Sequence, residues 1–290
     1  MAWGGGIVDT HLHLWDPGRL SYPWHEFVPS HLAQPYLIDD YRAASAGTTV
    51  DAMVFIECFA GRDQSEKEVR FVEGQVAQDD RIKAIVMNAG LEQGVALGTY
   101  LEHMKATTPR LRGVRRALTF EPDPAFMLAP SFIVGVRLLQ HFDLSFEICV
   151  NNVQLAHVAR FAEQAPGVRL VLNHCGKPAI SKGDLEVWRG HIRDIAAFPN
   201  VICKLSDLPS EIGRQWTETQ IRPYIDAVVE DFGFGRLIYG GDWPICTIAM
   251  ELGEWKAVLD RCFSGVDDID LGKFYRNNAI ELYRLDIDRL

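Results

Sequence analysis

The strongest constraint on the fold is a regular alternation of short apolar runs with longer amphipathic stretches. Eight runs rich in Val, Ile, Leu and Phe occupy residues 6–13, 52–57, 82–88, 111–118, 145–150, 168–174, 201–205 and 236–240. Such runs are typical of parallel strands buried on both faces, and the stretches between them have helical periodicity. Eight strand–helix repeats in 290 residues predict a single (β/α)8 TIM barrel domain that spans residues 1–290.

The main competing architecture is an open, doubly wound parallel sheet. Folds of that kind usually bind nucleotides through a glycine-rich loop that follows the first strand. The sequence has neither a GxGxxG motif nor a P-loop, and no low-complexity linker divides it into two parts. These observations favour the barrel.

Charge and cysteine content narrow the environment and the partners. The formal net charge of -10 argues against nucleic acid or an anionic membrane as the partner. None of the six cysteines forms a CxxC pair, and most lie in apolar runs, as expected for reduced core cysteines. We find no signal-peptide pattern and no apolar run of membrane-spanning length, so we expect a cytoplasmic protein. The sequence leaves a monomer and a homodimer open.

Polar residues gather at the predicted carboxyl ends of the strands, where barrel enzymes place their active sites. His11 and His13 end the first run one residue apart, so both imidazoles point to the same face of a strand. Period-two counting adds His174 at the end of the sixth run and, if the chain stays extended, Asp242 after the eighth. Glu147 lies inside the fifth run, where an ionised carboxylate needs a partner.

The same counting predicts which neighbours share the side that faces the site. It places Asp9 on the face of His11 and His13, and Leu172 on the face of His174.

Three imidazoles and two carboxylates at one end of a barrel fit a mononuclear divalent site, for which zinc is the expected ion. Asp242 can either ligate the ion or take a proton from the metal-bound water, whose pKa falls to about 7. For Glu147 the alternative to metal ligation is an ion pair with Arg115 or Lys204.

Other chemistries have less support. The sequence has no GxSxG elbow for a serine nucleophile. Cys149 or Cys175 beside His174 would have to act from within apolar sequence, which disfavours the thiolate. A glycosidase pair made of Glu57 and Glu147 would leave the histidines unexplained.

Several motifs taken together resemble the amidohydrolase superfamily, in particular its branch of L-fuconolactonases and L-rhamnono-gamma-lactonases, to which pyrone-dicarboxylate lactonases are related. The matching stretches are DTHLHLWDP (9–17), YPW (22–24), GRD (61–63), LRGVR (111–115), LVLNHCGKP (170–178), VICKLSDL (201–208), LIYGGDWPIC (237–246) and FYRNNAIELYRL (274–285). The resemblance spans nearly the whole chain and implies a distorted (β/α)8 barrel of the amidohydrolase type.

The resemblance also implies roles for individual residues. His11 and His13 match the metal ligands of the first strand, and His174 matches the catalytic histidine of the sixth. Asp242 matches the aspartate of the eighth strand, which activates water and can also bind the ion.

Two positions depart from the family pattern. The fourth strand offers Arg115 and Arg116 where many relatives carry a carboxylated lysine, which argues against a binuclear site. The fifth strand offers Glu147 where a histidine is common, and we interpret it as a replacement metal ligand. Because some members of this branch are thought to work without a metal, metal-independent operation stays open as an alternative to one divalent ion.

The function that the resemblance implies is hydrolysis of a small-molecule lactone, of the L-rhamnono-, L-fucono- or related aldonolactone type, in carbohydrate catabolism. One alternative is an anionic lactone from aromatic degradation, because Arg115 and Arg116 could bind its carboxylate. A metal-dependent decarboxylase is a further alternative, and a non-catalytic barrel would not be expected to retain the whole polar set. The candidates to hold the substrate hydroxyls, with ordinary packing or surface charge as the alternative for each, are Trp24, His25, Arg62, Arg115, Lys204 and Trp243.

Overall fold

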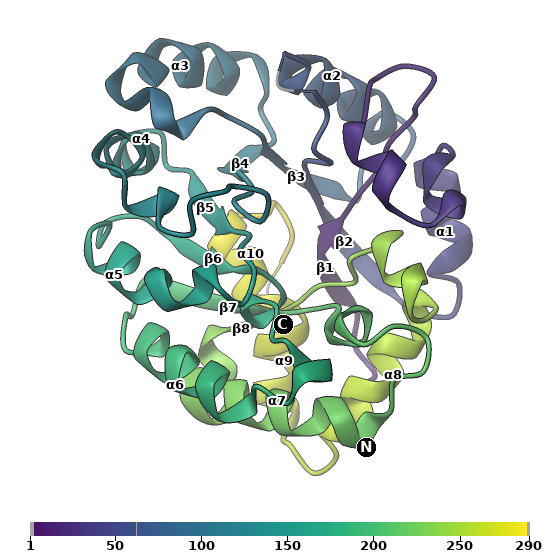
Figure 1. The fold of residues 1–290 in the computed structure, drawn as a ribbon. Helices are drawn as coiled ribbons and strands as arrows, with labels where there is room; N and C mark the ends of the chain where they lie inside the picture. The colour runs from purple at the N-terminus through teal and green to yellow at the C-terminus, as the bar shows by residue number, and fades with distance from the viewer. Residues whose placement is uncertain (1–2, 62, 289–290) are drawn as a thin grey trace.

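Eight parallel strands surround a central axis in chain order, as the computed structural model shows for residues 3–61 and 63–288 (Figure 1). They are β1 (Ile7–Leu12), β2 (Val50–Ile56), β3 (Ile82–Met87), β4 (Leu111–Val114), β5 (Ser145–Ile148), β6 (Leu170–Leu172), β7 (Val201–Leu205) and β8 (Leu237–Tyr239). All eight coincide with predicted runs, and together with the helices between them they confirm the TIM barrel.

Helices cover the outside of the barrel between successive strands (Figure 1). They are α1 (Ile38–Ala44), α2 (Ser65–Val76), α3 (Gly98–Thr107), α4 (Pro130–His141), α5 (Val158–Glu163), α6 (Leu185–Ala196), α7 (Glu218–Phe232) and α8 (Leu252–Cys262), followed by α9 (Asp268–Gly272) and α10 (Asn278–Tyr283). Among the described residues, no helix has both the length and the apolar character that crossing a membrane requires.

The barrel is nearly closed: β8 and β1 are joined by a short bridge near their carboxyl ends instead of a continuous ladder. Leu12 and Trp243 form an isolated parallel bridge, and the His13 backbone N–H donates to the Trp243 carbonyl at 2.9 Å. This seam brings the segment after β8 directly beside the two histidines of β1.

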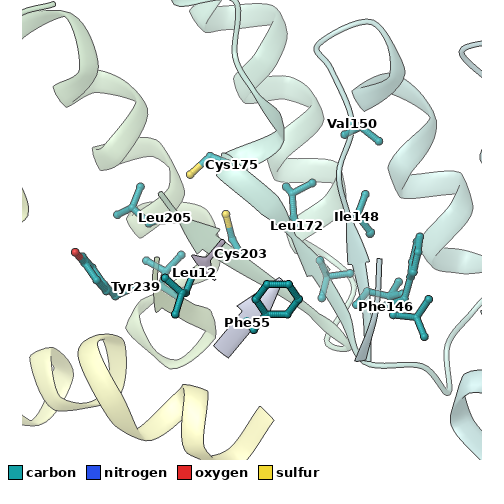
Figure 2. Close-up of a cluster of buried hydrophobic side chains, with 14 of the residues drawn as sticks. Leu12, Phe55, Phe146, Ile148, Val150, Leu172, Cys175, Cys203, Leu205 and Tyr239 are labelled. Atoms are coloured by element: carbon teal, nitrogen blue, oxygen red, sulfur yellow. The ribbon is translucent and has the colours of Figure 1, made fainter. Parts of the chain in front are cut away.

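Apolar side chains fill two regions on either side of the strands. Residues such as Phe55, Phe146 and Leu205 point outward and pack beneath the helices (Figure 2). A second cluster lines the barrel interior with Val, Ala and Ile side chains and includes Ile280 and Tyr283 of α10. Because α10 supplies part of that inner cluster, polar residues in the barrel concentrate toward the other, carboxyl-terminal end.

In β1 and at the end of β6, the strands that lead to the histidines, side chains do not alternate strictly between the two faces of the sheet. The register between β1 and β2 shifts between Asp9 and Leu12, so the prediction that Asp9 shares the face of His11 is wrong. The Asp9 carboxylate instead accepts hydrogen bonds from the Tyr41 hydroxyl at 2.8 Å and the Gly241 N–H at 2.7 Å. A bulge explains the difference, since one extra residue moves all later side chains to the other face.

The prediction that Leu172 shares the face of His174 is also wrong. Leu172 belongs to the outer core, while the next residue, Asn173, donates to Glu147 inside the barrel. His174 still reaches the barrel mouth because it and Cys175 adopt left-handed backbone angles, with φ of 50° and 52°. A turn, rather than continued strand geometry, therefore positions this histidine.

Candidate active site

Four of the predicted site residues converge at the carboxyl ends of β1, β6 and β8. The Nε2 atoms of His11 and His13 each lie 3.3 Å from Oδ1 of Asp242. The Nδ1 atom of His174 lies 4.0 Å from the other carboxylate oxygen of Asp242. All four side chains are buried. The structure thus brings together both histidines of the HxH motif, the histidine after β6 and the aspartate after β8.

The turn after β8 depends on two glycines. A Cβ atom on Gly240 would lie 3.0 Å from the Cβ of His11, and one on Gly241 would lie 2.5 Å from the Asp9 carboxylate. Asp242 then adopts a left-handed conformation with a φ of 54°, which turns its side chain toward the histidines. The two glycines therefore let the chain pass close to His11 and Asp9, and a larger residue at either position would displace these neighbours.

Neighbouring polar groups fix the orientation of the imidazoles. The Nδ1 of His13 lies 2.8 Å from the Ile56 carbonyl oxygen, which can only accept, so Nδ1 carries the proton and Nε2 offers a lone pair. The Nδ1 of His174 lies 2.9 Å from the Ser206 hydroxyl, which leaves Nε2 of that ring free to act.

Burial strongly affects the charge states of the histidines and the aspartate of the site. Burial lowers the pKa of His11, helped by the nearby Lys204 ammonium, and lowers that of His174 to about 3 despite the Asp242 carboxylate. Burial alone would raise the pKa of Asp242, but His174, His13 and Asp207 together hold it below 3.8. At neutral pH the site therefore combines neutral His11 and His174 with an ionised carboxylate.

Asp207, in the turn after β7, shares this environment with Asp242. Burial and the Asp242 carboxylate raise its pKa well above 3.8, so Asp207 holds a proton when Asp242 is ionised. The Ser210 hydroxyl donates to the Asp207 carboxyl group. Two adjacent carboxyl groups thus carry a single negative charge, which resides on Asp242.

The donor set fits a divalent cation. Oδ1 of Asp242 is buried and, among the described residues, has no hydrogen-bond donor, although two imidazole nitrogens lie 3.3 Å away. His11, His174 and Asp242 offer ligand atoms that all lie within 4.8 Å of one another. The Ile56 carbonyl leaves the Nε2 lone pair of His13 facing Oδ1 of Asp242, two acceptors that a cation between them would stabilise, and nitrogen with carboxylate oxygen is a typical zinc environment.

Glu147 is not placed with this group. Its carboxylate pairs with the Lys204 ammonium at 2.9 Å and accepts hydrogen bonds from Asn173 and Tyr283. The structure thus shows the ion pair that the sequence left open as the alternative to metal ligation. Because both carboxylate oxygens have protein partners, we leave Glu147 out of the proposed ligand set.

Two of the predicted substrate-binding cations are already engaged within the protein. Arg115 is only 2% exposed and its Nε donates to Glu57 at 2.6 Å, while its Nη1 lies 3.3 Å from Nε2 of His11. Lys204 donates to the Thr10 carbonyl at 2.8 Å as well as to Glu147. Both are therefore better placed to position the site than to hold sugar hydroxyls.

The predicted aromatic contacts divide into two groups. Trp24 and His25 lie in the 3-10 helix η1 (Pro23–Phe27), partly exposed, and the indole N–H of Trp24 donates to the Cys58 carbonyl at 2.7 Å. Trp243 is buried against the ring of Tyr36 at 5.3 Å, so it packs the seam between β8 and β1. Arg62 lies outside the described residues.

Lys177 is a cation near the site that the sequence reasoning did not single out. It ends the left-handed turn after β6, where its N–H donates to the His174 carbonyl at 2.9 Å. Burial alone would lower its pKa, but Cys149 and the carboxylates of Glu211 and Asp242 raise it above 10.5. Within residues 3–61 and 63–288 we find no side-chain hydrogen bond or ion pair for its ammonium. In the sequence, the feature that could have identified Lys177 is its place in the NHCGKP motif (173–178).

Comparison with known families matches residues 8–285 to the family described as Amidohydrolase. The chain belongs to the amidohydrolase family. This amidohydrolase is 32% identical, over 88% of its length and 87% of the relative's, to an L-fucono-1,5-lactonase from Burkholderia multivorans. It is 24% identical, over 96% of its length and 98% of the relative's, to an L-rhamnono-gamma-lactonase from Scheffersomyces stipitis.

A solved structure extends the comparison to three dimensions. A crystal structure of an amidohydrolase from Burkholderia multivorans with bound Zn is similar with a TM-score of 0.86 and 30% identity, covering 97% of this chain and 100% of that one. The sequence relatives support classification of this amidohydrolase as a hydrolase of the lactonase type.

Proposed function

We propose that this amidohydrolase opens a sugar-acid lactone, of the L-fucono-, L-rhamnono- or related aldonolactone class, to the aldonic acid. The observation that carries the proposal is the buried, ionised Asp242, whose Oδ1 has no hydrogen-bond donor within residues 3–61 and 63–288 and lies 3.3 Å from two imidazoles. A carboxylate in that setting is suited to take a proton from a water molecule. The curated lactonases that align with the chain supply the substrate class.

His11, His13 and Asp242 would hold one divalent ion, for which zinc is our proposal. When bound, such an ion acts as a Lewis acid and lowers the pKa of water to about 7. The tautomer of His13, fixed by the Ile56 carbonyl, presents the lone pair that ligation requires.

In the proposed reaction, Asp242 accepts a proton from water as the water oxygen bonds to the lactone carbonyl carbon. His174 would donate from Nε2 to the carbonyl oxygen, which becomes negative in the tetrahedral intermediate. This role requires the tautomer in which the Ser206 hydroxyl, 2.9 Å from Nδ1, donates to that nitrogen and the ring proton lies on Nε2. The ring C–O bond then breaks, and Asp242 returns its proton to the departing ring oxygen. Lys177 provides a positive charge for the carboxylate that forms as the acid ionises.

The alternative of an anionic lactone loses its main support. Arg116 is paired with Glu92 at 3.3 Å and also with Glu121, and Arg115 is paired with Glu57. Neither guanidinium is free to bind a substrate carboxylate bidentately. We therefore favour a neutral sugar lactone over an anionic lactone from aromatic degradation.

The test is Asp242→Asn, assayed by acid release from a panel of neutral and anionic lactones. We expect the wild type to prefer neutral aldonolactones, and the variant to lose about 100-fold to 10,000-fold in kcat. Asp226→Asn, which removes an exposed carboxylate paired with Arg222, is the matched control. Hydrolysis by a correctly folded Asp242→Asn protein near the wild-type rate would refute the proposed base.

The metal is tested separately by chelation and elemental analysis. We expect one zinc per chain, loss of activity in the chelated protein and recovery on adding zinc. Full activity of a metal-free preparation would exclude the ion from the reaction and leave Asp242, His174 and Lys177 as the working groups.

A further inference from the structure

Two phenylalanines from different loops form a pair at the mouth of the barrel. Phe59 follows β2 and Phe120 follows β4, and their ring centroids lie 5.4 Å apart with an interplanar angle of 72°. Phe120 is 71% exposed, which is unusual for a ring of this size. The pair is therefore an apolar surface that this part of the chain presents to solvent.

The pair lies next to the proposed reacting centre. The ring of Phe59 covers the Arg115 guanidinium, with 5.2 Å between the guanidinium carbon and the ring centroid. The same guanidinium approaches His11 on another side, with Nη1 3.3 Å from Nε2. One guanidinium group thus separates the Phe59 ring from a histidine of the site.

Both loops are held in place. The Phe59 backbone is left-handed, with a φ of 53°, and its N–H donates to Glu57 at 2.8 Å. On the other loop, the N–H of Leu118 donates to the Cys149 carbonyl at 2.9 Å, and the Asn151 amide donates to the Thr119 carbonyl at 3.2 Å. These contacts anchor the loop of Phe120 to the segment after β5, so the exposed position of the Phe120 ring is fixed by hydrogen bonds of its loop.

We propose that Phe59 and Phe120 form a subsite for an apolar substituent of the lactone, in particular the methyl group of a 6-deoxy sugar acid. This inference rests on the proposed function and adds to it the feature that selects the substrate. A methyl group gains from burial against an aromatic face. A hydroxymethyl group at the same position would turn a hydroxyl toward the rings, which offer it no strong hydrogen-bond partner.

Selectivity between two otherwise identical lactones tests the subsite. L-fuconolactone and L-galactonolactone differ only in a methyl in place of a hydroxymethyl group. We expect wild-type kcat/KM to favour the methyl compound by about tenfold, as a single group in an apolar pocket typically does. Phe120→Ala should reduce the ratio to about two, while Phe120→Leu, which keeps an apolar side chain, should retain most of it.

The controls separate this inference from the proposed function. Val187→Ala removes an equally exposed apolar side chain, 68% exposed on the outer helix α6, and should leave the ratio unchanged. Calorimetric binding of both lactones to Asp242→Asn protein measures the preference without turnover. A wild type without preference, or a ratio unchanged in Phe120→Ala, overturns the subsite even if lactones are hydrolysed. Absence of all lactone hydrolysis overturns the proposed function, and the binding ratio then decides the subsite alone.

Discussion

Replacement of Glu147 by glutamine removes the negative charge that balances a buried ammonium. Glu147 and Lys204 are both fully buried, with 2.9 Å between Oε2 and Nζ. Glutamine preserves the size of the side chain and can still contact Asn173 and Tyr283. The variant therefore tests whether the charge of Glu147 stabilises the fold or serves the metal.

The expected destabilisation is large because Lys204 would be left buried without a counter-charge. Removing one partner of a buried ion pair typically costs about 3–5 kcal/mol. For a domain of this size that corresponds to a fall in Tm of about 10 °C. Tyr283→Phe, which removes only a hydrogen bond to Glu147, should cost about 1 kcal/mol.

The loss should also depend on pH with a defined sign. Burial lowers the pKa of Lys204 below 10.5, and Glu147 opposes that shift. Without Glu147 the folded protein releases a proton that the unfolded chain retains, so its stability rises with pH up to about 10.5. Each pH unit should recover at most about 1.4 kcal/mol.

Urea unfolding of Glu147→Gln between pH 6 and 9, beside the wild type and Glu147→Gln/Lys204→Met, measures these effects. The double variant should regain most of the lost stability, because it removes both charges. Unchanged stability together with loss of bound zinc would refute the structural role and restore Glu147 as a ligand. A pH-independent loss would show that Lys204 remains charged and compensated by other groups.

Three further predictions concern the site and the acid limb of stability. Lys177→Met should weaken inhibition by the aldonate product about tenfold while neutral substrate analogues bind nearly as before, and equal weakening of both would refute its role toward the carboxylate. Ser206→Ala should lower kcat about tenfold with KM little changed, because it leaves His174 without its Nδ1 partner; a change confined to KM would contradict the positioning role. Arg81 and Arg42 hold the pKa of Asp79 at about 2, so this carboxylate stabilises the fold above pH 3.8 and loses that contribution as pH falls toward 2. Asp79→Asn should therefore cost about 1–2 kcal/mol at pH 7 and almost nothing near pH 2, and a pH-independent cost in urea unfolding would refute the pairing argument.

The sequence predicted which residues form the site better than it predicted which way their side chains point. Glu147 and Lys204 lie on β5 and β7, whose registers are regular, and both reach the barrel interior, where they pair with each other. Alternation failed for Asp9, where β1 is bulged, and for the outward Leu172. Period-two counting assumes an extended chain, and the chain is not extended at the site.

The sequence also could not predict which charged side chains pair with one another in the folded protein. The sequence offers Arg115 and Lys204 both as substrate contacts and as ion-pair partners of Glu147, and tertiary contacts pair Arg115 with Glu57 and Lys204 with Glu147. A buried charge takes the nearest compensating group, and the distance to that group depends on how strands far apart in sequence pack together. Lys177 is the opposite case: among the described side chains it has no such partner, and its place in the NHCGKP motif is what points to the site.

The sequence by itself determined the number and order of the strands and the identity of His11, His13, His174 and Asp242. Apolar periodicity and local motifs suffice for that, because strand formation and strand order depend on patterns within short stretches of chain. Only the tertiary structure decided how the four side chains meet. Their convergence depends on a bulge in β1, on left-handed turns after β6 and β8, and on glycines that let β8 lie against β1. Those features are set by contacts between distant segments, which no local pattern contains.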